Sequence, residues 1–205
     1  MTANVSEYHR RVAAANRGSI LAAASDLFLQ DGYDRTSLAR VAEAAGVSKA
    51  TLFKQFPTKA ALFEATVLAA GDSSPDELPQ PPAGDLERGL VVLGLAYAEI
   101  LGRPRIEALL RTIIAEAPRF PELRERTFDF GTLPVLSSLR AFLVAETSAG
   151  RASAAYPDTA APQFLGMIAT VVFWPRLVHG GSLTDDEIRR VVEEAAKTMV
   201  ARYGR

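Results

Sequence analysis

Apolar residues recur along the chain at the spacing of an amphipathic helix, and no segment shows the sustained period of two that a half-buried strand requires. Ile20, Ala24 and Phe28 begin this pattern. Thr36, Ser37, Ser48 and Thr58 are suited to cap helix N-termini, while Gly32, Gly46 and Pro57 interrupt the pattern. The first 70 residues are therefore predicted to form four short helices, over about 17–30, 36–45, 48–56 and 58–70.

A loop rich in proline, glycine and acidic residues covers 71–89, and the helical pattern resumes after it. Thr184 and Glu187 have the spacing of a capping box. The later helices are predicted over about 85–101, 104–117, 122–147 with a break near Gly131 and Pro134, 158–179, and 184–203. We therefore expect an all-α fold of about nine to ten helices, with one domain over residues 1–70 and a larger one over 71–205.

The composition is that of a soluble globular chain, with 205 residues, 48% of them hydrophobic and 23% charged. The longest mainly apolar run, 164–175, is shorter than the roughly 20 residues of a spanning helix. Residues 9–17 are charged but lead into no apolar signal region. We expect a cytoplasmic protein with no membrane partner.

Catalytic and metal chemistry have few candidate residues in this chain. It has no cysteine and two histidines, so thiolate metal sites and disulfides are excluded. His179 has no nucleophile motif to serve. The acidic group 185–187 is better explained as the first turn of a capped helix than as a cation site. We expect no enzyme activity, no metal site and no cofactor.

The turn Ala45-Gly46-Val47 joins two short helices in the layout of a helix-turn-helix, with the second helix over about 48–56. With Leu52 and Phe56 facing inward, the second helix presents a mixed polar surface made of Lys49, Ala50, Thr51, Lys54 and Gln55. Such a surface offers a positive charge to phosphates, and hydroxyl, amide and methyl groups to base edges. Net charge adds little, since residues 1–70 carry +2 and the remainder −3.

The stretch from Ala22 to Phe63, AAASDLFLQDGYDRTSLARVAEAAGVSKATLFKQFPTKAALF, resembles the DNA-binding domain of tetracycline-repressor (TetR) family transcription regulators. The resemblance implies a three-helix DNA-binding domain in which helix 48–56 enters the major groove. It places Thr36, Ser37, Phe53 and Lys59 along the phosphates, and the full set of implied DNA contacts is Thr36, Ser37, Arg40, Ser48, Lys49, Ala50, Thr51, Phe53, Lys54, Gln55 and Lys59. The chain departs from the family at Phe53, usually Tyr, and at Gln55, often His or Tyr.

From Arg105 onward, the phrase LLRTIIAEAPRFPEL and the helix containing AAPQFLGMI resemble the C-terminal domain of TetR repressors of efflux and solvent response. This resemblance implies a homodimer formed by the last two helices and a cavity for a small hydrophobic effector. The apolar stripe of the last helix agrees with such an interface, for which we expect Phe164, Ile168, Trp174, Ile188, Val191, Val192, Ala195 and Met199. The candidate cavity residues are Tyr97, Leu101, Leu110, Ile113, Phe128, Phe130, Leu133, Met167 and Phe173.

The function expected from these features is a dimeric repressor that binds a pseudo-palindromic DNA operator and is released by an unknown small molecule. Two alternatives remain, a DNA-binding dimer without an effector and a helical small-molecule-binding protein or enzyme without DNA function. Arg10, Arg11 and Arg17 fit either an arm reaching DNA or a frayed terminus, and the sequence favours the frayed terminus.

Overall fold

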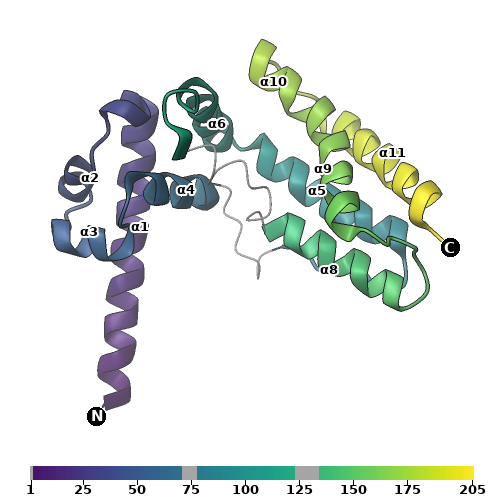
Figure 1. The fold of residues 1–205 in the computed structure, drawn as a ribbon, viewed down its shortest axis with the longest axis horizontal. Helices are drawn as coiled ribbons and strands as arrows, with labels where there is room; N and C mark the ends of the chain where they lie inside the picture. Colours follow the sequence, from purple (N-terminus) through teal and green to yellow (C-terminus); the bar gives the residue numbers. More distant parts are fainter. Residues whose placement is uncertain (1, 71–77, 123–133) are drawn as a thin grey trace. The chain divides into compact units, whose positions relative to one another are not determined.

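The computed structural model describes residues 2–70, 78–122 and 134–205, with side chains from residue 7. The chain divides into two compact units, one comprising residues 1–70 and 108–129 and the other residues 71–107 and 130–205. All regular elements within the described residues are helices, and an isolated bridge between Ala152 and Gly204 is the one β-type pairing among them (Figure 1). The prediction of an all-α fold is confirmed.

The first unit is built around a long N-terminal helix. Its elements are α1 (Thr2–Arg35), α2 (Leu38–Ala44), α3 (Lys49–Gln55), α4 (Lys59–Ala70) and residues 108–116 of α6 (Pro104–Glu116). Phe28, Tyr33 and Phe63 pack edge to face or stacked at its centre, with the Phe28 and Phe63 ring centroids 4.8 Å apart. Such aromatic pairs add to the free energy gained from burial alone.

Residues 108–122 were expected in the C-terminal domain, but their contacts group them with the first unit. The Phe120 ring lies edge-on to the Tyr33 ring, with 5.1 Å between centroids. Arg119 forms an ion pair with Asp34 at 3.1 Å. A boundary read from a loop at 71–89 cannot detect this return of the chain, because the loop marks a break in the sequence pattern and not a contact in space.

Helix α1 begins at Thr2, about 15 residues before the start predicted from its apolar stripe. Residues 7–15 are exposed, so this part has no buried face to produce a stripe. It does contain alanine-rich sequence without proline, which favours a helix. The left-handed φ of 78° at Gly32 interrupts the regular conformation near the other end, where the prediction placed the stop.

The second unit is a group of packed helices on either side of α5. Its elements are α5 (Leu86–Gly102), the first four residues of α6, α8 (Pro134–Ser148), α9 (Pro157–Val172), α10 (Trp174–His179) and α11 (Asp185–Tyr203). The predicted capping box at the start of α11 is present, with Thr184 and Glu187 bonded reciprocally. The part of the predicted helix 122–147 that falls within 123–133 lies outside the described residues.

Close packing of α5, α9 and α11 uses most of the residues that were expected to form a dimer interface. A Cβ placed on Gly94 would lie 2.7 Å from Val192 and 3.0 Å from Phe164, so these helices meet at van der Waals contact. Phe164, Ile168, Val192, Ala195 and Met199 are all buried within the protomer. The chain's own helices thus cover these five residues, and the dimer interface itself stays a prediction.

The segment 157–179 was predicted as one helix, but it breaks at Phe173 into α9 and α10. Pro175 has no N–H to continue the α9 ladder, which explains the break. By length and composition these 23 residues could cross a membrane, with a mean hydropathy of 1.3. Because Phe164 and Ile168 pack against α5 in the protein interior, we assign the segment to the core.

Candidate nucleic-acid interface

The helix-turn-helix is formed by α2, α3 and the turn between them. Gly46 has a φ of 65°, a left-handed conformation that glycine adopts at little cost, and the Val47 N–H returns to the Ala42 carbonyl at 3.0 Å. Ser37 and Ser48 cap α2 and α3 by accepting from the N–H groups of Arg40 and Thr51. The buried residues Val41, Ala42 and Leu52 fix the two helices to the core.

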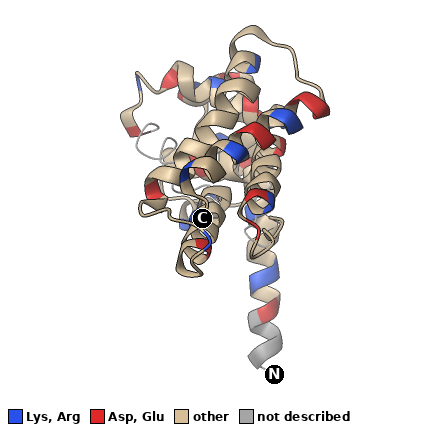
Figure 2. Ribbon diagram, turned by 90° about the vertical axis from the view of Figure 1, so that its right-hand side faces the viewer, with Lys and Arg blue, Asp and Glu red and all other residues tan. Residues whose placement is uncertain are grey.

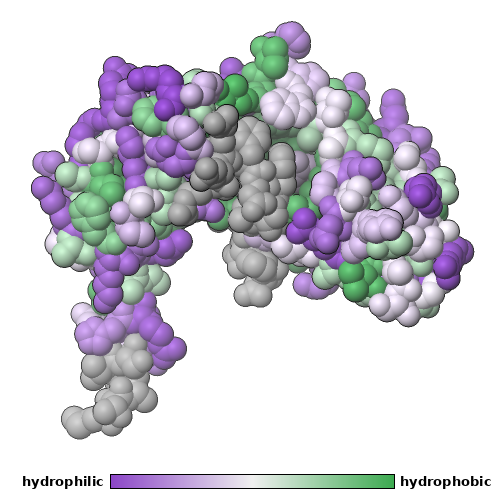
Figure 3. Space-filling model, viewed as in Figure 1, coloured by the Kyte–Doolittle hydropathy of each residue, from purple (hydrophilic) through white to green (hydrophobic). Residues whose placement is uncertain are grey.

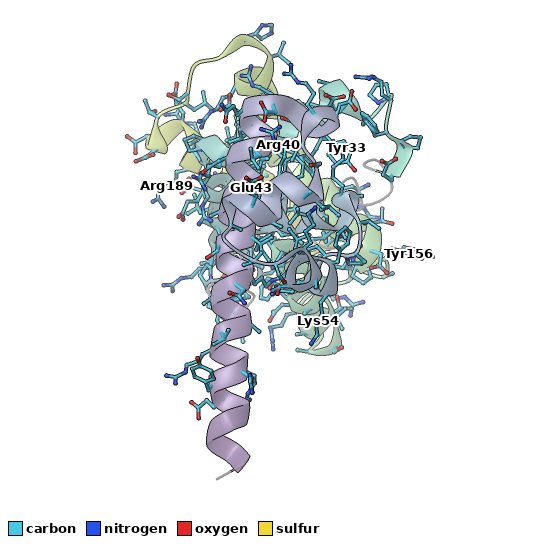
Figure 4. All side chains as sticks on the ribbon, turned by 90° about the vertical axis from the view of Figure 1, so that its left-hand side faces the viewer. Tyr33, Arg40, Glu43, Lys54, Tyr156 and Arg189 are labelled. Atoms are coloured by element: carbon cyan, nitrogen blue, oxygen red, sulfur yellow. The ribbon has the colours of Figure 1, made fainter. Side chains whose placement is uncertain are left out.

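The outward face of α3 contains two lysines, a methyl group and an aromatic ring. Lys49, Ala50, Phe53 and Lys54 are exposed, while Leu52 and Phe56 are buried beneath them. Phe53 is 48% exposed, so its side chain is accessible to an external partner. Figure 4 shows Lys54 extending from this helix. The predicted orientation of α3 is thus present in the structure.

The hydroxyl of Thr51 is half-exposed and is shared with the cap of its own helix. Its Oγ1 lies 2.8 Å from the Ser48 Oγ, and either atom can be the donor. This pairing holds the Thr51 oxygen beside the cap while leaving a lone pair and the methyl group for an external partner. Ser48 therefore positions the outward-facing residues of α3 by capping the start of that helix.

Gln55 does not point away from the protein with the lysines. Its Nε2 donates to the backbone carbonyl of Ala13 on α1, at 3.4 Å, and the side chain is half-buried. The role of this amide in reading a base stays a prediction, and in this structure the amide is engaged with α1. On the same part of α1, the Arg17 guanidinium lies 4.7 Å from the centroid of the Phe56 ring.

Thr36 was expected to contact phosphate, but its hydroxyl is internal. The side chain is 1% exposed and donates to the carbonyls of Leu27 and Gly32, at 3.2 and 2.8 Å. It joins the end of α1 to the start of α2. Arg40 remains half-exposed but forms an ion pair with Asp31 at 2.8 Å and donates to the Arg35 carbonyl. Figure 4 shows Arg40 and Glu43 on α2.

Lys59 was also expected on phosphate, and the structure gives its ammonium group another role. The Nζ donates to the carbonyls of Tyr33 and Asp34, at 2.9 and 3.1 Å, and lies 4.4 Å from the centroid of the Tyr33 ring. Burial lowers the pKa of Lys59, against the opposing effect of the carboxylates of Asp34, Glu122 and Glu116. This lysine satisfies carbonyls at the end of α1, which a sequence pattern does not reveal.

The Tyr33 hydroxyl completes the same corner of the first unit. It donates to Glu122 at 3.4 Å, and burial raises its pKa well above the ordinary value. Lys59 also lies 5.8 Å from the centroid of the Phe120 ring. The segment after α6 is therefore held to the end of α1 by a group of aromatic and charged side chains.

The residues expected to line an effector cavity belong to both units. Tyr97, Leu101, Met167 and Phe173 are in the second unit, and Leu110 and Ile113 are in the first. Tyr97 is 3% exposed, and burial raises its pKa to about 12. Phe128, Phe130 and Leu133 lie outside the described residues.

The described part of the chain contains no candidate metal site. It has no group of three or more histidine, cysteine, aspartate or glutamate residues that could hold an ion. The acidic first turn of α11 at 185–187 serves the helix N-terminus through the Thr184 and Glu187 capping box.

Two family models match the chain over its two parts. Residues 20–66 match the model described as bacterial regulatory proteins, tetR family. Residues 88–205 match the model described as AefR-like transcriptional repressor, C-terminal domain. The first match contains the helix-turn-helix described above, and the second contains α9, α11 and all but the first two residues of α5.

Curated relatives include the DNA-binding transcriptional repressor TetR of Mycobacteroides abscessus, 27% identical over 89% of this chain and 92% of that protein. The uncharacterized HTH-type transcriptional regulator YdeS of Bacillus subtilis is 36% identical over 40% of each chain. The HTH-type transcriptional regulator RutR of Escherichia coli is 46% identical over 28% of this chain and 27% of its own. The chain thus matches YdeS and RutR over less than half of their lengths.

Solved structures extend the similarity to nearly the whole chain. A putative TetR-family transcriptional regulator from Mesorhizobium loti has a TM-score of 0.76 and 28% identity, over 94% of this chain and 98% of its own. A protein described as flavonoid-responsive regulator FrrA has a TM-score of 0.74 and 29% identity, over 92% of this chain and 97% of its own.

Proposed function

Because the chain belongs to the TetR family of transcriptional regulators, we propose that it is a homodimeric repressor in the cytoplasm that binds a pseudo-palindromic operator and is released by a small molecule. The observation that carries the proposal is the exposed face of α3. Its side chains Lys49, Ala50, Phe53 and Lys54 are all exposed to solvent. A protein–DNA interface needs such a surface, with cations for phosphates and small groups for base edges.

Within this surface the residues have different tasks. Lys49 and Lys54 supply charge to the phosphates or to guanine edges, and Ala50 with the Thr51 methyl group meets thymine methyls. Phe53 packs its ring against a deoxyribose of the backbone, because a phenyl ring offers no hydrogen-bond donor to phosphate. Thr36, Gln55 and Lys59 hold α2, α3 and α4 to α1 through the contacts described above.

A second copy of the chain covers an exposed apolar face of α9 and α10. Val171 near the end of α9 and Trp174 and Val178 on α10 are 46%, 41% and 70% exposed. Ile188 and Val191 on α11 are half-exposed, and we retain them as part of the predicted interface. Burial of this face would supply the apolar core that a stable dimer requires.

The dimer is tested by matched charge substitutions at two exposed valines. Val171→Asp places a charge on the proposed interface, and Val144→Asp places one on α8 at 49% exposure. We expect sedimentation to show a folded monomer for Val171→Asp and a dimer for Val144→Asp. A dimer in both variants would remove this interface.

The proposed effector is a small hydrophobic molecule bound in the second unit. Support comes from the similar protein that is described as flavonoid-responsive, and from Tyr97, whose phenol is desolvated inside that unit. We expect a member of a flavonoid panel to raise the melting temperature and to release DNA. Tyr97→Phe, which removes only the hydroxyl, should weaken both effects if the phenol donates to the effector.

The operator is identified by selecting duplexes from a randomised pool with the full-length protein. Two-fold symmetry predicts two inverted half-sites about one helical turn apart, ~34–36 Å. A selected motif without inverted repeats would contradict a dimer that presents two copies of α3. Recovery of random sequence, with no enrichment, would contradict base reading altogether.

A further inference from the structure

The N-terminal part of α1 is an exposed basic helix that the fold does not need for packing. Residues 7–17 contain Arg10, Arg11, Arg17 and His9, with Glu7 as their only acidic residue. Residues 7–15 are exposed, and Figure 3 shows the surface of this part of the helix as mainly hydrophilic. A helix with no buried face gains little from tertiary packing, so the basic side chains of this part of α1 have no role in the core.

This basic helix adjoins the DNA-reading helix through two contacts. The Gln55 amide on α3 reaches the Ala13 carbonyl, and Arg17 lies over the ring of Phe56, which follows α3. Residues 10, 13 and 17 fall on one side of a helix, because they are separated by three and four residues. Arg10 is therefore on the side of α1 that faces α3, one turn beyond the contact at Ala13.

Beyond that contact the helix extends past the end of α3. Figure 4 shows α1 continuing beyond the helix that carries Lys54, and Figure 2 shows basic residues along this part. At a rise of 1.5 Å per residue, Arg10 lies about 4.5 Å and Glu7 about 9 Å beyond Ala13 along the axis. These distances correspond to roughly one to three base-pair steps of 3.4 Å each.

We propose that this arm, residues 7–17, binds the phosphate backbone of the duplex immediately outside the base pairs that α3 reads. Arg10 and Arg11 provide the charge, and the contacts from Gln55 and Arg17 fix the direction of the arm relative to α3. The inference rests on the proposed DNA-binding function and adds a second, sequence-independent contact to it. The surface is continuous with the α3 face and its charge is opposite to that of DNA, so the occupant is nucleic acid.

The arm has a defined effect on binding. Two arginines in each of two protomers can neutralise up to four phosphates, and each neutralised phosphate contributes about 0.9 to the slope of log affinity against log salt. Contacts to phosphate carry no direct base information. The arm therefore increases affinity and salt dependence and lengthens the protected region, while the selected sequence motif stays the same.

The test compares two variants with the same change in charge. Arg10→Gln with Arg11→Gln removes the arm charge, and Arg189→Gln with Arg190→Gln removes an adjacent arginine pair exposed on α11. We expect the arm variant to lower the salt slope by up to about 3.6 units and to lose hydroxyl-radical protection outside the motif. The α11 variant should match the wild type, and both should keep the wild-type melting temperature and dimer state.

A charge gain provides the converse experiment. Glu7→Arg should raise the affinity for operator and scrambled duplexes by similar factors and steepen the salt slope, which a role in folding alone would not do. If the wild type selects a motif but the arm variant keeps the wild-type slope and footprint, the arm proposal is overturned and the proposed function stands. If the wild type selects no DNA, the proposed function itself fails.

Discussion

Helices α3 and α11 both present a clear division of apolar and polar positions, yet the two divisions have different meanings. In α3, Leu52 enters the core and the lysines remain in water. In α11, Val192 also enters the core, although its stripe was expected to meet another protomer. An apolar stripe therefore predicts that a face is buried, but the residues that cover it are decided by the packing of the rest of the chain.

The polar face of α3 is informative for the opposite reason. Its lysines offer charge to phosphates, and its small apolar groups can meet base edges, so the face has the chemistry that a DNA interface uses. On α11 the exposed face is dominated by charged residues in an alternating arrangement, which solvation explains without a partner.

The largest expected effect on stability is at the buried stripe of α11, and comparing it with a substitution on α9 distinguishes the core from the proposed interface. Val192→Asp would place a charge at a site that is 0% exposed, and we expect a loss of about 3–5 kcal/mol or more in the free energy of unfolding. Val171→Asp, on an exposed position, should give a folded monomer. Denaturant unfolding with sedimentation measures both, and a well-folded Val192→Asp monomer would restore the stripe as an interface.

Packing at Gly94 gives the next effect. Gly94→Ala would bring a methyl group within 2.7 Å of Val192, and overpacking of this kind costs about 1–3 kcal/mol. Gly18→Ala on α1 meets nothing within 4 Å and should stabilise the helix by about 0.5–1 kcal/mol. Thermal melts of the two variants should thus shift in opposite directions, and a common direction would contradict the described core.

Local features of the fold could be predicted from the sequence, whereas contacts between distant segments could not. The turn at Gly46, the serine caps and the α11 capping box are local features, and the structure confirms them. The close approach of α5 and α11 at Gly94 depends on residues almost 100 positions apart, so no local pattern encodes it. The same holds for Lys59, whose ammonium partners lie on α1, 25 and 26 residues earlier.

Two further differences have local causes that an apolar stripe does not record. The arm of α1 was missed because exposed residues in a helix need no stripe. The end of α9 was missed because the apolar pattern continues through Phe173 and Trp174, although Pro175 interrupts the hydrogen bonding. In the candidate site, the outward lysines of α3 could be predicted, whereas the inward roles of Thr36 and Gln55 required the positions of α1 and α2.

A buried carboxylate in the second unit predicts a dependence of stability on pH. Glu146 is 1% exposed, and hydrogen bonds from Arg151 and from the Gly84 N–H keep its pKa below the ordinary 4.5. Its stabilising contribution is thus complete above about 4.5 and is lost as the pH falls through the lowered folded-state pKa.

Glu146→Gln keeps the shape of the side chain and removes the charge. We expect it to melt ~2–4 °C below the wild type near pH 7, with the difference shrinking near pH 3. Arg151 is partly exposed, so solvent screening limits the size of the effect. A difference that is constant over this range would show that ionisation of Glu146 does not contribute to stability.

The smallest effect distinguishes two lysines of the first unit. Lys59→Met should lower stability by about 1 kcal/mol, because it removes the hydrogen bonds to the Tyr33 and Asp34 carbonyls. Lys54→Met should leave stability unchanged and weaken DNA binding. If Lys59→Met instead melts like the wild type and reduces the salt slope of DNA binding, its role on phosphate would be restored.

The salt dependence of DNA binding tests the account most directly. Full-length wild type, Lys49→Gln with Lys54→Gln, and the control pair Arg189→Gln with Arg190→Gln would be titrated with the selected operator duplex at several salt concentrations. Two lysines on each of two α3 helices predict a slope reduced by up to about 3.6 units for the α3 variant and an unchanged slope for the control. An α3 variant with the wild-type slope would contradict the claim that α3 lies on DNA.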